Sequence, residues 1–131
     1  MFKVNKLTDY ATVVMVDLVS ADLARPSQKI ANNTGIPFTT VNKLMKDLLS
    51  AGLVRSHRGI NGGYSLASPA NKITIADIIQ AVEGPIALTS CVNNSLDKCT
   101  YENFCAVQGR WNRVNKAVVT ALKKVTVADM T

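Results

Sequence analysis

The chain has 131 residues, of which 47% are hydrophobic and 18% are charged, so it can build one modest core and lacks the polar bias of a disordered protein. Its length excludes large multidomain enzymes. Fifteen Lys and Arg against nine Asp and Glu give a net charge of +6, which indicates a polyanionic partner. Most of this excess lies between Arg25 and Leu66, where six basic residues accompany a single acid, Asp47.

The sequence favours a cytoplasmic protein without a membrane partner. No apolar run approaches the roughly 18 residues that a membrane span requires. Asp17 and Asp22 interrupt the apolar run near the N-terminus, and no small-residue cleavage site of a signal peptide follows it. The three cysteines all lie within residues 91–105, and an intracellular chain of this size does not need disulfides, so metal ligation or redox sensing is the leading use.

Apolar residues at helical spacing predict a first helix, for which Thr8 is the expected N-cap. These residues are Ala11, Val14, Met15, Leu18 and Val19. A loop carrying Arg25 and Pro26 then leads to a short helix from about Ser27 to Asn32. The cluster of Asn, Thr and Gly at positions 33–35 is expected to end that helix.

A second strong helix follows, with one apolar and one polar face. The apolar positions are Val41, Leu44, Met45, Leu48 and Leu49, and the opposite face carries Thr39, Asn42, Lys43 and Lys46. Two helices joined by a tight turn with a Gly are typical of a helix-turn-helix, whose second helix enters the DNA major groove. The lysines suit phosphates, Thr39 and Thr40 suit phosphates or base edges, and Asn42 matches adenine. An ordinary solvated helix face is the alternative.

The next segment predicts a β-hairpin of the kind called a wing. Residues Leu53–Arg58 and Tyr64–Leu66 form the expected strands, on either side of a glycine-dense turn. Arg58 is expected to follow phosphates or enter a narrow minor groove, whereas His57 is expected to be a plain surface residue. The full set of candidate DNA contacts is Ser27, Thr39, Thr40, Asn42, Lys43, Lys46, Arg58 and Asn61.

The last third of the chain contains two more predicted helices. Thr74 and Asp77 resemble a capping box ahead of an apolar stripe of Ile75, Ile78, Ile79 and Val82, and Gly84 and Pro85 end this helix. Further on, apolar residues alternate in steps of four and three, as in the seam of a two-helix coil, and predict a dimer. The seam is Val107, Trp111, Val114, Val118, Ala121 and Val125. Packing of this stripe on its own domain is the alternative, but three other helices already offer apolar faces to a small core.

The cysteines are separated by seven residues between Cys91 and Cys99 and by five between Cys99 and Cys105. This spacing does not match a zinc knuckle, and it suits a loop around a larger group such as an iron–sulfur cluster. Lys98 beside Cys99 favours the thiolate, which is the form that binds metal. The alternative is that the cysteines are small hydrophobic residues or regulatory thiols.

The segment from Ala24 to Leu66, with "GIPFTTVNKLMKDLLSAGLVRSHRGINGGYSL", closely resembles the winged helix-turn-helix of the Rrf2 family of bacterial transcription regulators. The order of "LTDYA", "RG..GGY" and the three cysteines extends the resemblance over nearly the whole chain. It implies a mainly α fold with a small β-hairpin and a long C-terminal dimerisation helix. Residues 1–70 are expected to form the DNA-binding domain, and residues 71–131 the cluster-binding loop and dimerisation helix, in one compact unit. The homodimer is expected to bind operator DNA whose half-sites mirror its two-fold axis.

The resemblance also implies a ligand set for the cluster, with Cys91, Cys99 and Cys105 as three ligands. Family members that govern cluster assembly use a His three residues after the third Cys, where this chain has Gln108, a poor ligand for iron. Nitric-oxide sensors of the family instead take an Asp from the first helix of the partner subunit, and Asp9 of "LTDYA" stands at that place. Gln108, Glu102 or an exogenous small ligand are the alternatives. Asp9 also has a structural role, since a carboxylate early in a helix favours the helix dipole.

The expected function is therefore an iron–sulfur cluster-dependent regulator, acting as a repressor of genes for cluster assembly or for redox and nitric-oxide stress. The cluster is [2Fe–2S] or [4Fe–4S]. The alternative is a cluster-free repressor controlled by thiol oxidation or by a protein partner. An enzyme with a Cys nucleophile is not expected, because His57 is the only His, lies in the predicted wing and has no second base beside it.

Overall fold

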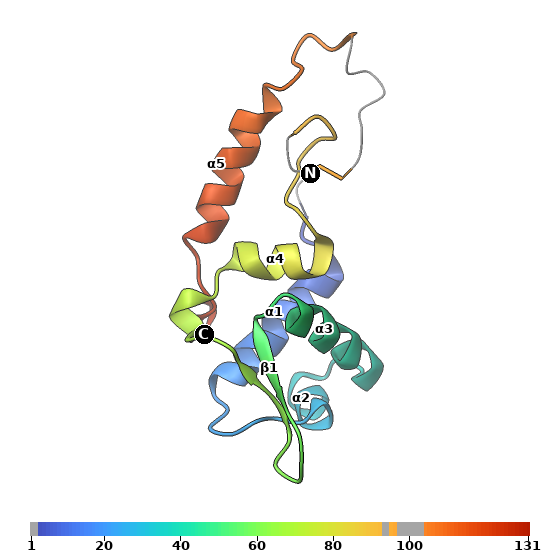
Figure 1. Ribbon diagram of the computed structural model, residues 1–131, viewed down its shortest axis with the longest axis vertical. Helices are drawn as coiled ribbons and strands as arrows, with labels where there is room; N and C mark the ends of the chain where they lie inside the picture. The colour runs from blue at the N-terminus through green and yellow to red at the C-terminus, as the bar shows by residue number, and fades with distance from the viewer. Residues whose placement is uncertain (1–2, 93–94, 97–103) are drawn as a thin grey trace.

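The computed structural model describes residues 3–92, 95–96 and 104–131 (Figure 1). The described residues are mainly helical and carry one two-stranded antiparallel hairpin, which confirms the predicted fold class. The elements in chain order are α1 (Lys6–Val19), α2 (Ser27–Thr34), α3 (Phe38–Ser50), β1 (Val54–His57), β2 (Gly63–Leu66), the 3-10 turn η1 (Ala70–Lys72), α4 (Ile75–Glu83), α5 (Trp111–Lys123) and the 3-10 turn η3 (Ala128–Met130).

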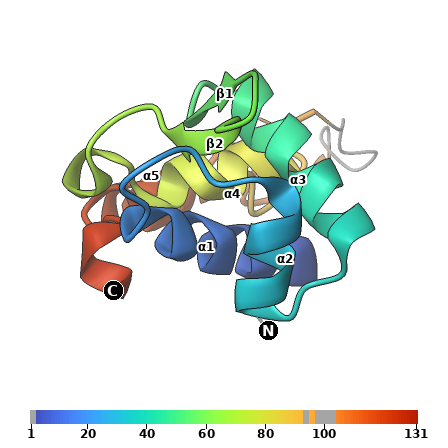
Figure 2. The same cartoon turned by 90° about the horizontal axis from the view of Figure 1, so that it is seen from below.

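The core lies where α1, α3 and α4 meet, as the view from the hairpin end shows (Figure 2). Met15 of α1, Leu44 of α3 and Ile78 of α4 are fully buried, as their helical spacing predicts. Val127, close to the C-terminus, is buried in the same cluster. The end of the chain therefore packs against the first helix rather than forming a separate core.

The first helix begins earlier than expected, and the prediction that Thr8 caps it is wrong. Asn5 is the N-cap, and its side chain accepts a hydrogen bond from the backbone N–H of Leu7 at 2.8 Å. Thr8 lies inside the helix, is 1% exposed, and donates its hydroxyl hydrogen to the Glu83 carboxylate at 2.6 Å. Asp9 remains in the first turn, where its charge favours the helix dipole.

The hairpin has the predicted place, with slightly different ends. Its register runs from the pair Val54 and Leu66 to the pair His57 and Gly63, so Arg58 belongs to the turn and Gly63 to the second strand. A third segment joins the sheet at one point, because the backbone of Arg25 exchanges hydrogen bonds of 2.8 and 2.9 Å with that of Tyr64. The loop before α2 is thus fixed to the wing.

The ends of α2 and α4 follow local sequence signals. The second helix runs two residues further than expected, to Thr34, and stops at Gly35 with φ 77°, a conformation that glycine adopts readily. The capping box that begins α4 is confirmed, with Thr74 and Asp77 each accepting a hydrogen bond from the other's backbone N–H. Gly84 ends this helix.

The fifth helix extends away from the core, at the end of the molecule opposite the hairpin (Figure 1). It is shorter than the predicted seam, since Val107 precedes it and Val125 follows it, which corrects the expectation for those two residues. After the helix, the chain pairs with residues 73–75 at the start of α4, through Ile75 N–H to Val125 O at 2.9 Å and Val127 N–H to Ile73 O at 2.8 Å. Among the described residues, every helix is too short or too polar to cross a bilayer.

Candidate nucleic-acid interface and cysteine segment

The polar face of α3 is exposed as the sequence predicts. Val41, Leu44, Met45 and Leu48 are fully buried, which turns the opposite face to solvent. Thr39, Lys43 and Lys46 are exposed there, and Thr40 and Asn42 are partly exposed. Leu49, which was expected on the packed face, is 41% exposed. The buried face of α3 therefore covers a narrower strip of the helix than the apolar residues in the sequence predicted.

Cations on α3 remain available to a partner. Lys43 lies 3.5 Å from the Asp47 carboxylate, one helical turn away, and such an exposed pair is weak because water screens it. Lys46 is exposed and has no ion-pair partner among the described residues. In the described structure neither α2 nor α3 has a side-chain cap, so the backbone N–H groups of their first turns are also open to a phosphate.

The wing contributes a second exposed surface. Arg58 and Asn61 are exposed in its turn, which a hydrogen bond of 2.9 Å from Gly62 N–H to Gly59 O closes. His57 is exposed and lies 2.8 Å from the Ser65 hydroxyl, as expected for a surface residue. Arg55 is also exposed on β1. Arg55 belongs to the basic stretch of the sequence, but it was not among the DNA contacts predicted from the sequence.

One cation of the basic stretch does not face solvent. The guanidinium of Arg25 forms an ion pair of 3.0 Å with Asp17, and the two side chains are 17% and 14% exposed. The basic surface therefore rests on residues that are all exposed, namely Lys29, Lys43, Lys46, Arg55 and Arg58. They belong to α2, α3 and the hairpin, away from α5 (Figure 1).

The cysteine segment joins α4 to α5. Cys91 is half-buried, with its sulfur 3.0 Å from the Thr89 hydroxyl, and Cys105 is exposed. Cys99, its neighbour Lys98 and the alternative ligand Glu102 lie outside the described residues. The predicted fourth ligand, Asp9, is exposed on α1, and the alternative Gln108 is exposed just before α5.

Within one chain, the described residues do not bring these donors together. No group of three His, Cys, Asp or Glu side chains able to hold a metal ion occurs among them. Asp9 instead borders a mostly apolar hollow between α1, α4 and the C-terminal turn, beside Ile75, Ile79 and Met130. A site that uses Asp9 together with the cysteines therefore requires residues outside the described part, a second chain, or both.

The sequence did not predict the polar contacts of two buried residues near the cysteine segment, Asn115 and Thr8. Asn115 of α5 is 5% exposed, accepts a hydrogen bond from Leu88 N–H and donates one to Ile86 O, both at 2.9 Å. Its position gave a clue, because Asn115 falls four residues after Trp111 and three before Val118, on the apolar side of the helix. The bond from Thr8 to Glu83 joins α1 to the end of α4 and had no sequence signal.

The apolar side of α5 is open in the single chain. Trp111 is 37% exposed and Val114 is 43% exposed, Val118 is half-buried and Ala121 is exposed. A hollow of about 540 Å³ lies beside this helix, lined among others by Ile79, Val118 and Leu122. Exposed apolar area of this kind is typical of a surface that another chain covers.

Comparisons with known proteins agree with this architecture. The Rrf2 family model, described as "Iron-dependent Transcriptional regulator", matches residues 4–131. An HTH-type transcriptional regulator of Mycobacterium tuberculosis is 30% identical over 131 residues, which cover 98% of this chain and 80% of the relative.

Two solved structures share the fold over almost the whole chain. CymR of Bacillus subtilis, described as the global cysteine regulator, is 30% identical with a TM-score of 0.73, covering 99% of this chain and 96% of CymR. IscR of T. potens is 29% identical with a TM-score of 0.72, covering 98% of this chain and 85% of that protein.

Proposed function

The chain belongs to the Rrf2 family of transcriptional regulators, and on that premise we propose that it is an iron–sulfur cluster-dependent repressor that binds operator DNA as a homodimer. Its relatives are DNA-binding regulators and not enzymes. One observation carries the proposal of a cluster. All three cysteines fall in the single segment between α4 and α5, in a chain whose family model is described as iron-dependent.

We assign DNA contact to α3 and the wing. The exposed lysines of α3 and Arg58 of the wing neutralise phosphates, and the amide of Asn42 is suited to an adenine edge. The proposed contacts are Ser27, Thr39, Thr40, Asn42, Lys43, Lys46, Arg58 and Asn61, to which the structure adds Arg55 as a further exposed cation. Residues 1–70 thus serve DNA binding and residues 71–131 serve sensing and dimerisation, as two functions on one core.

We assign the apolar side of α5 to contact with a second copy of the chain. Trp111, Val114, Val118 and Ala121 lie on that side, whereas Val107 and Val125 flank the helix. Its exposed apolar side chains and the neighbouring hollow support this assignment. A two-fold dimer would present two α3 helices to two operator half-sites.

The cluster would be held by Cys91, Cys99 and Cys105, because thiolates are the ligands that iron–sulfur clusters take. The described thiols suit this chemistry, since Cys105 is exposed and Cys91 is only half-buried, so neither is enclosed in the core. We propose Asp9 of a second copy as the fourth ligand, on the ground that it is exposed. A bound cluster would supply an iron centre that responds to iron supply, oxidants or nitric oxide.

Two contacts link the neighbourhood of the cysteine segment to the rest of the chain: one to α5 and one between α4 and α1 of the DNA-binding part. Asn115 holds residues 86–88 against α5. Thr8, next to Asp9, donates to Glu83 at the end of α4. In our proposal, a cluster held by the segment would act on α5 and α1 through these bonds, and hence on the spacing of the two α3 helices in the dimer.

A cluster-free regulator controlled by thiol oxidation or by a protein partner is the second candidate. The exposure of Cys105 favours it, because an accessible thiol can be oxidised directly. The two candidates differ in what the isolated protein contains.

Anaerobic purification decides between the two candidates. We expect a visible absorbance band, iron and sulfide in comparable amounts, and Mössbauer spectra that identify the cluster type. Affinity for operator DNA should differ between the cluster-loaded and the cluster-free protein. Colourless, iron-free protein from every oxygen-protected preparation would overturn the cluster and leave the thiol-controlled regulator.

Single variants test the ligands. Replacing Cys91, Cys99 or Cys105 by Ser should each lower iron content after anaerobic reconstitution, and Asp9→Ala should do the same. Asp22→Ala is the matched control, because Asp22 is an exposed carboxylate in the loop after α1 and should leave iron content unchanged. Equal retention and equal spectra in Asp9→Ala and Asp22→Ala would remove Asp9 as a ligand.

A further inference from the structure

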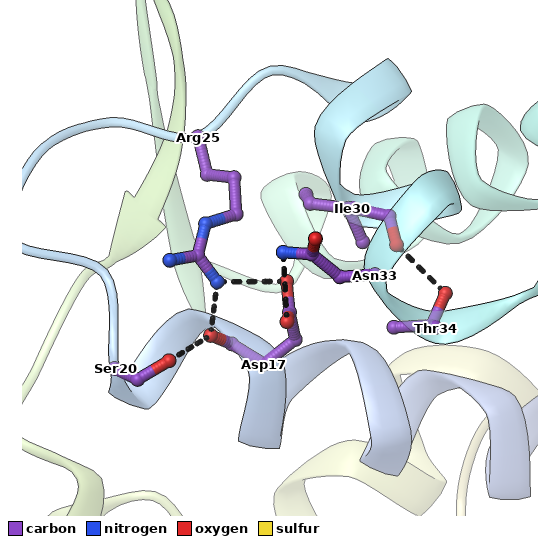
Figure 3. Close-up of polar contacts among 6 residues, drawn as sticks. All are labelled: Asp17, Ser20, Arg25, Ile30, Asn33 and Thr34. Atoms are coloured by element: carbon purple, nitrogen blue, oxygen red, sulfur yellow. Dashed lines mark hydrogen bonds and ion pairs between the residues drawn. The ribbon is translucent and has the colours of Figure 1, made fainter.

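Asp17 is the centre of a polar cluster between α1, α2 and the loop before α2, through both its carboxylate and its backbone carbonyl (Figure 3). The Nη1 atom of Arg25 donates to the backbone carbonyl of Asp17 at 2.7 Å and lies 3.0 Å from its Oδ2 atom. The side chain of Asn33 donates to Asp17 Oδ1 at 3.3 Å, and Ser20 Oγ donates to the Asp17 carbonyl at 3.1 Å. Asp17 therefore ties together segments that are separate in the sequence.

Through its backbone, Arg25 also holds the wing. Its N–H and C=O bond to the C=O and N–H of Tyr64 in β2. At Gly63, next to Tyr64, the backbone of β2 lies directly against the loop before α2. A Cβ atom placed on Gly63 would overlap the carbonyl group of Arg25 and the nitrogen of Pro26. Any shift of Arg25 must therefore move β2 or break its pairing.

Through its side chain, Asn33 connects the same cluster to α3. Asn33 lies in the last turn of α2, and only residues 35–37 separate α2 from α3. α2 and α3 pack against each other. Asp17 thus contacts the loop that holds the wing and the helix that adjoins α3, and so connects the two proposed DNA-contacting elements.

Arg25 is poorly placed to bind a phosphate itself. Its side chain is 17% exposed, and its guanidinium already faces the carboxylate and a carbonyl. The other bases of the basic stretch are all exposed. Water and salt screen this partly buried ion pair less than a surface pair, and the Nη1 hydrogen bond to the Asp17 carbonyl holds the guanidinium in place.

We propose that Asp17 and Arg25 form a positioning pair that sets the wing relative to α3 and so determines operator specificity without touching DNA. This inference rests on the proposed function, in which α3 and the wing read the operator. A duplex with a preferred sequence needs both elements at a fixed separation, whereas non-specific binding needs only the positive charge.

Asp17→Asn tests the inference, because the loss of a negative charge and the loss of wing positioning change DNA affinity in opposite directions. The full-length protein is first used to select a preferred duplex from random sequence, and affinity is then measured for this duplex and for a scrambled one of equal length. The variant removes a negative charge, so affinity for the scrambled duplex should stay equal or rise. Affinity for the selected duplex should fall by about tenfold, within the range of one mismatched base pair.

Asp47→Asn is the matched control, since it removes the same charge from the exposed pair with Lys43. It should raise both affinities together and leave their ratio unchanged. The inference is overturned if Asp17→Asn behaves in the same way. Failure of the wild-type protein to select any sequence would instead count against the proposed function.

Two substitutions of Arg25 keep the test informative if Asp17→Asn does not fold, which circular dichroism would reveal. Arg25→Lys keeps the charge but replaces the rigid, planar guanidinium that places Nη1 against both Asp17 oxygens by a flexible ammonium, and it should lower affinity for the selected duplex only. In Arg25→Gln, the slope of log affinity against log salt for the scrambled duplex should equal that of the wild type, whereas Lys46→Gln should reduce it by about 0.9. A reduced slope in Arg25→Gln, or unchanged selected-duplex affinity in Arg25→Lys, would overturn the inference.

Discussion

Replacing Asn115 by Ala tests how α5 holds the beginning of the cysteine segment. Asn115 is 5% exposed, and its amide bonds to the carbonyl of Ile86 and to the N–H of Leu88, both at 2.9 Å. Alanine leaves both backbone groups without their partner. A buried polar group left unsatisfied costs about 1–3 kcal/mol, so two such groups set a range of about 2–6 kcal/mol.

The expected loss lies in the lower half of that range. Ile86 is 9% exposed and Leu88 is half-buried, so water can replace part of the lost bonding once the segment loosens. We therefore expect the free energy of unfolding to fall by about 2–3 kcal/mol. The amide of Leu88 should also lose its protection against hydrogen exchange, because its acceptor is gone.

Urea denaturation at one fixed protein concentration measures the loss, since oligomerisation links stability to concentration. Thr120→Ala is the control on the same helix. Thr120 is exposed, and its substitution should change the free energy of unfolding by less than about 0.5 kcal/mol. If Asn115→Ala falls within that same margin and Leu88 stays protected, the amide does not hold the segment and the reasoning is refuted.

Three further predictions concern the wing, a helix cap and the dimer. Gly63→Ala should weaken operator binding while the helices stay folded, because the new methyl group displaces Arg25 from β2; unchanged binding in a gel-shift assay would contradict this. Thr74→Ala should lower the free energy of unfolding, measured by urea denaturation, by about 1 kcal/mol, because Asp77 N–H loses its acceptor. Thr74→Ser keeps a hydroxyl acceptor and should have nearly the wild-type free energy of unfolding. Val114→Glu should convert the proposed dimer to monomers in analytical ultracentrifugation, because it places a charge on the exposed apolar side of α5; a stable dimer in this variant would rule out that side of α5 as the interface.

Local signals in the sequence predicted most of the secondary structure. The capping box of α4 needs only Thr74 and Asp77, three residues apart, and the end of α2 needs only Gly35. Helical spacing of apolar residues located the buried faces of α1 and α3 for the same reason, since the pattern lies within one element. The wing followed from its glycines, and its strand ends moved by only one residue.

The helices, the hairpin and the basic and cysteine-bearing segments could be predicted, because each depends on residues close together in the chain. Which polar groups meet depends on the packing of distant segments. Thr8 and Asn5 are both good caps, and Thr8 turns inward because Glu83, 75 residues away, accepts its hydroxyl hydrogen. Arg25 belongs to the basic stretch of the sequence, but in the fold its guanidinium pairs with Asp17 and is mostly buried. Asn115 bonds to residues 27 and 29 positions earlier. Such partners depend on how the helices pack, which no local pattern encodes.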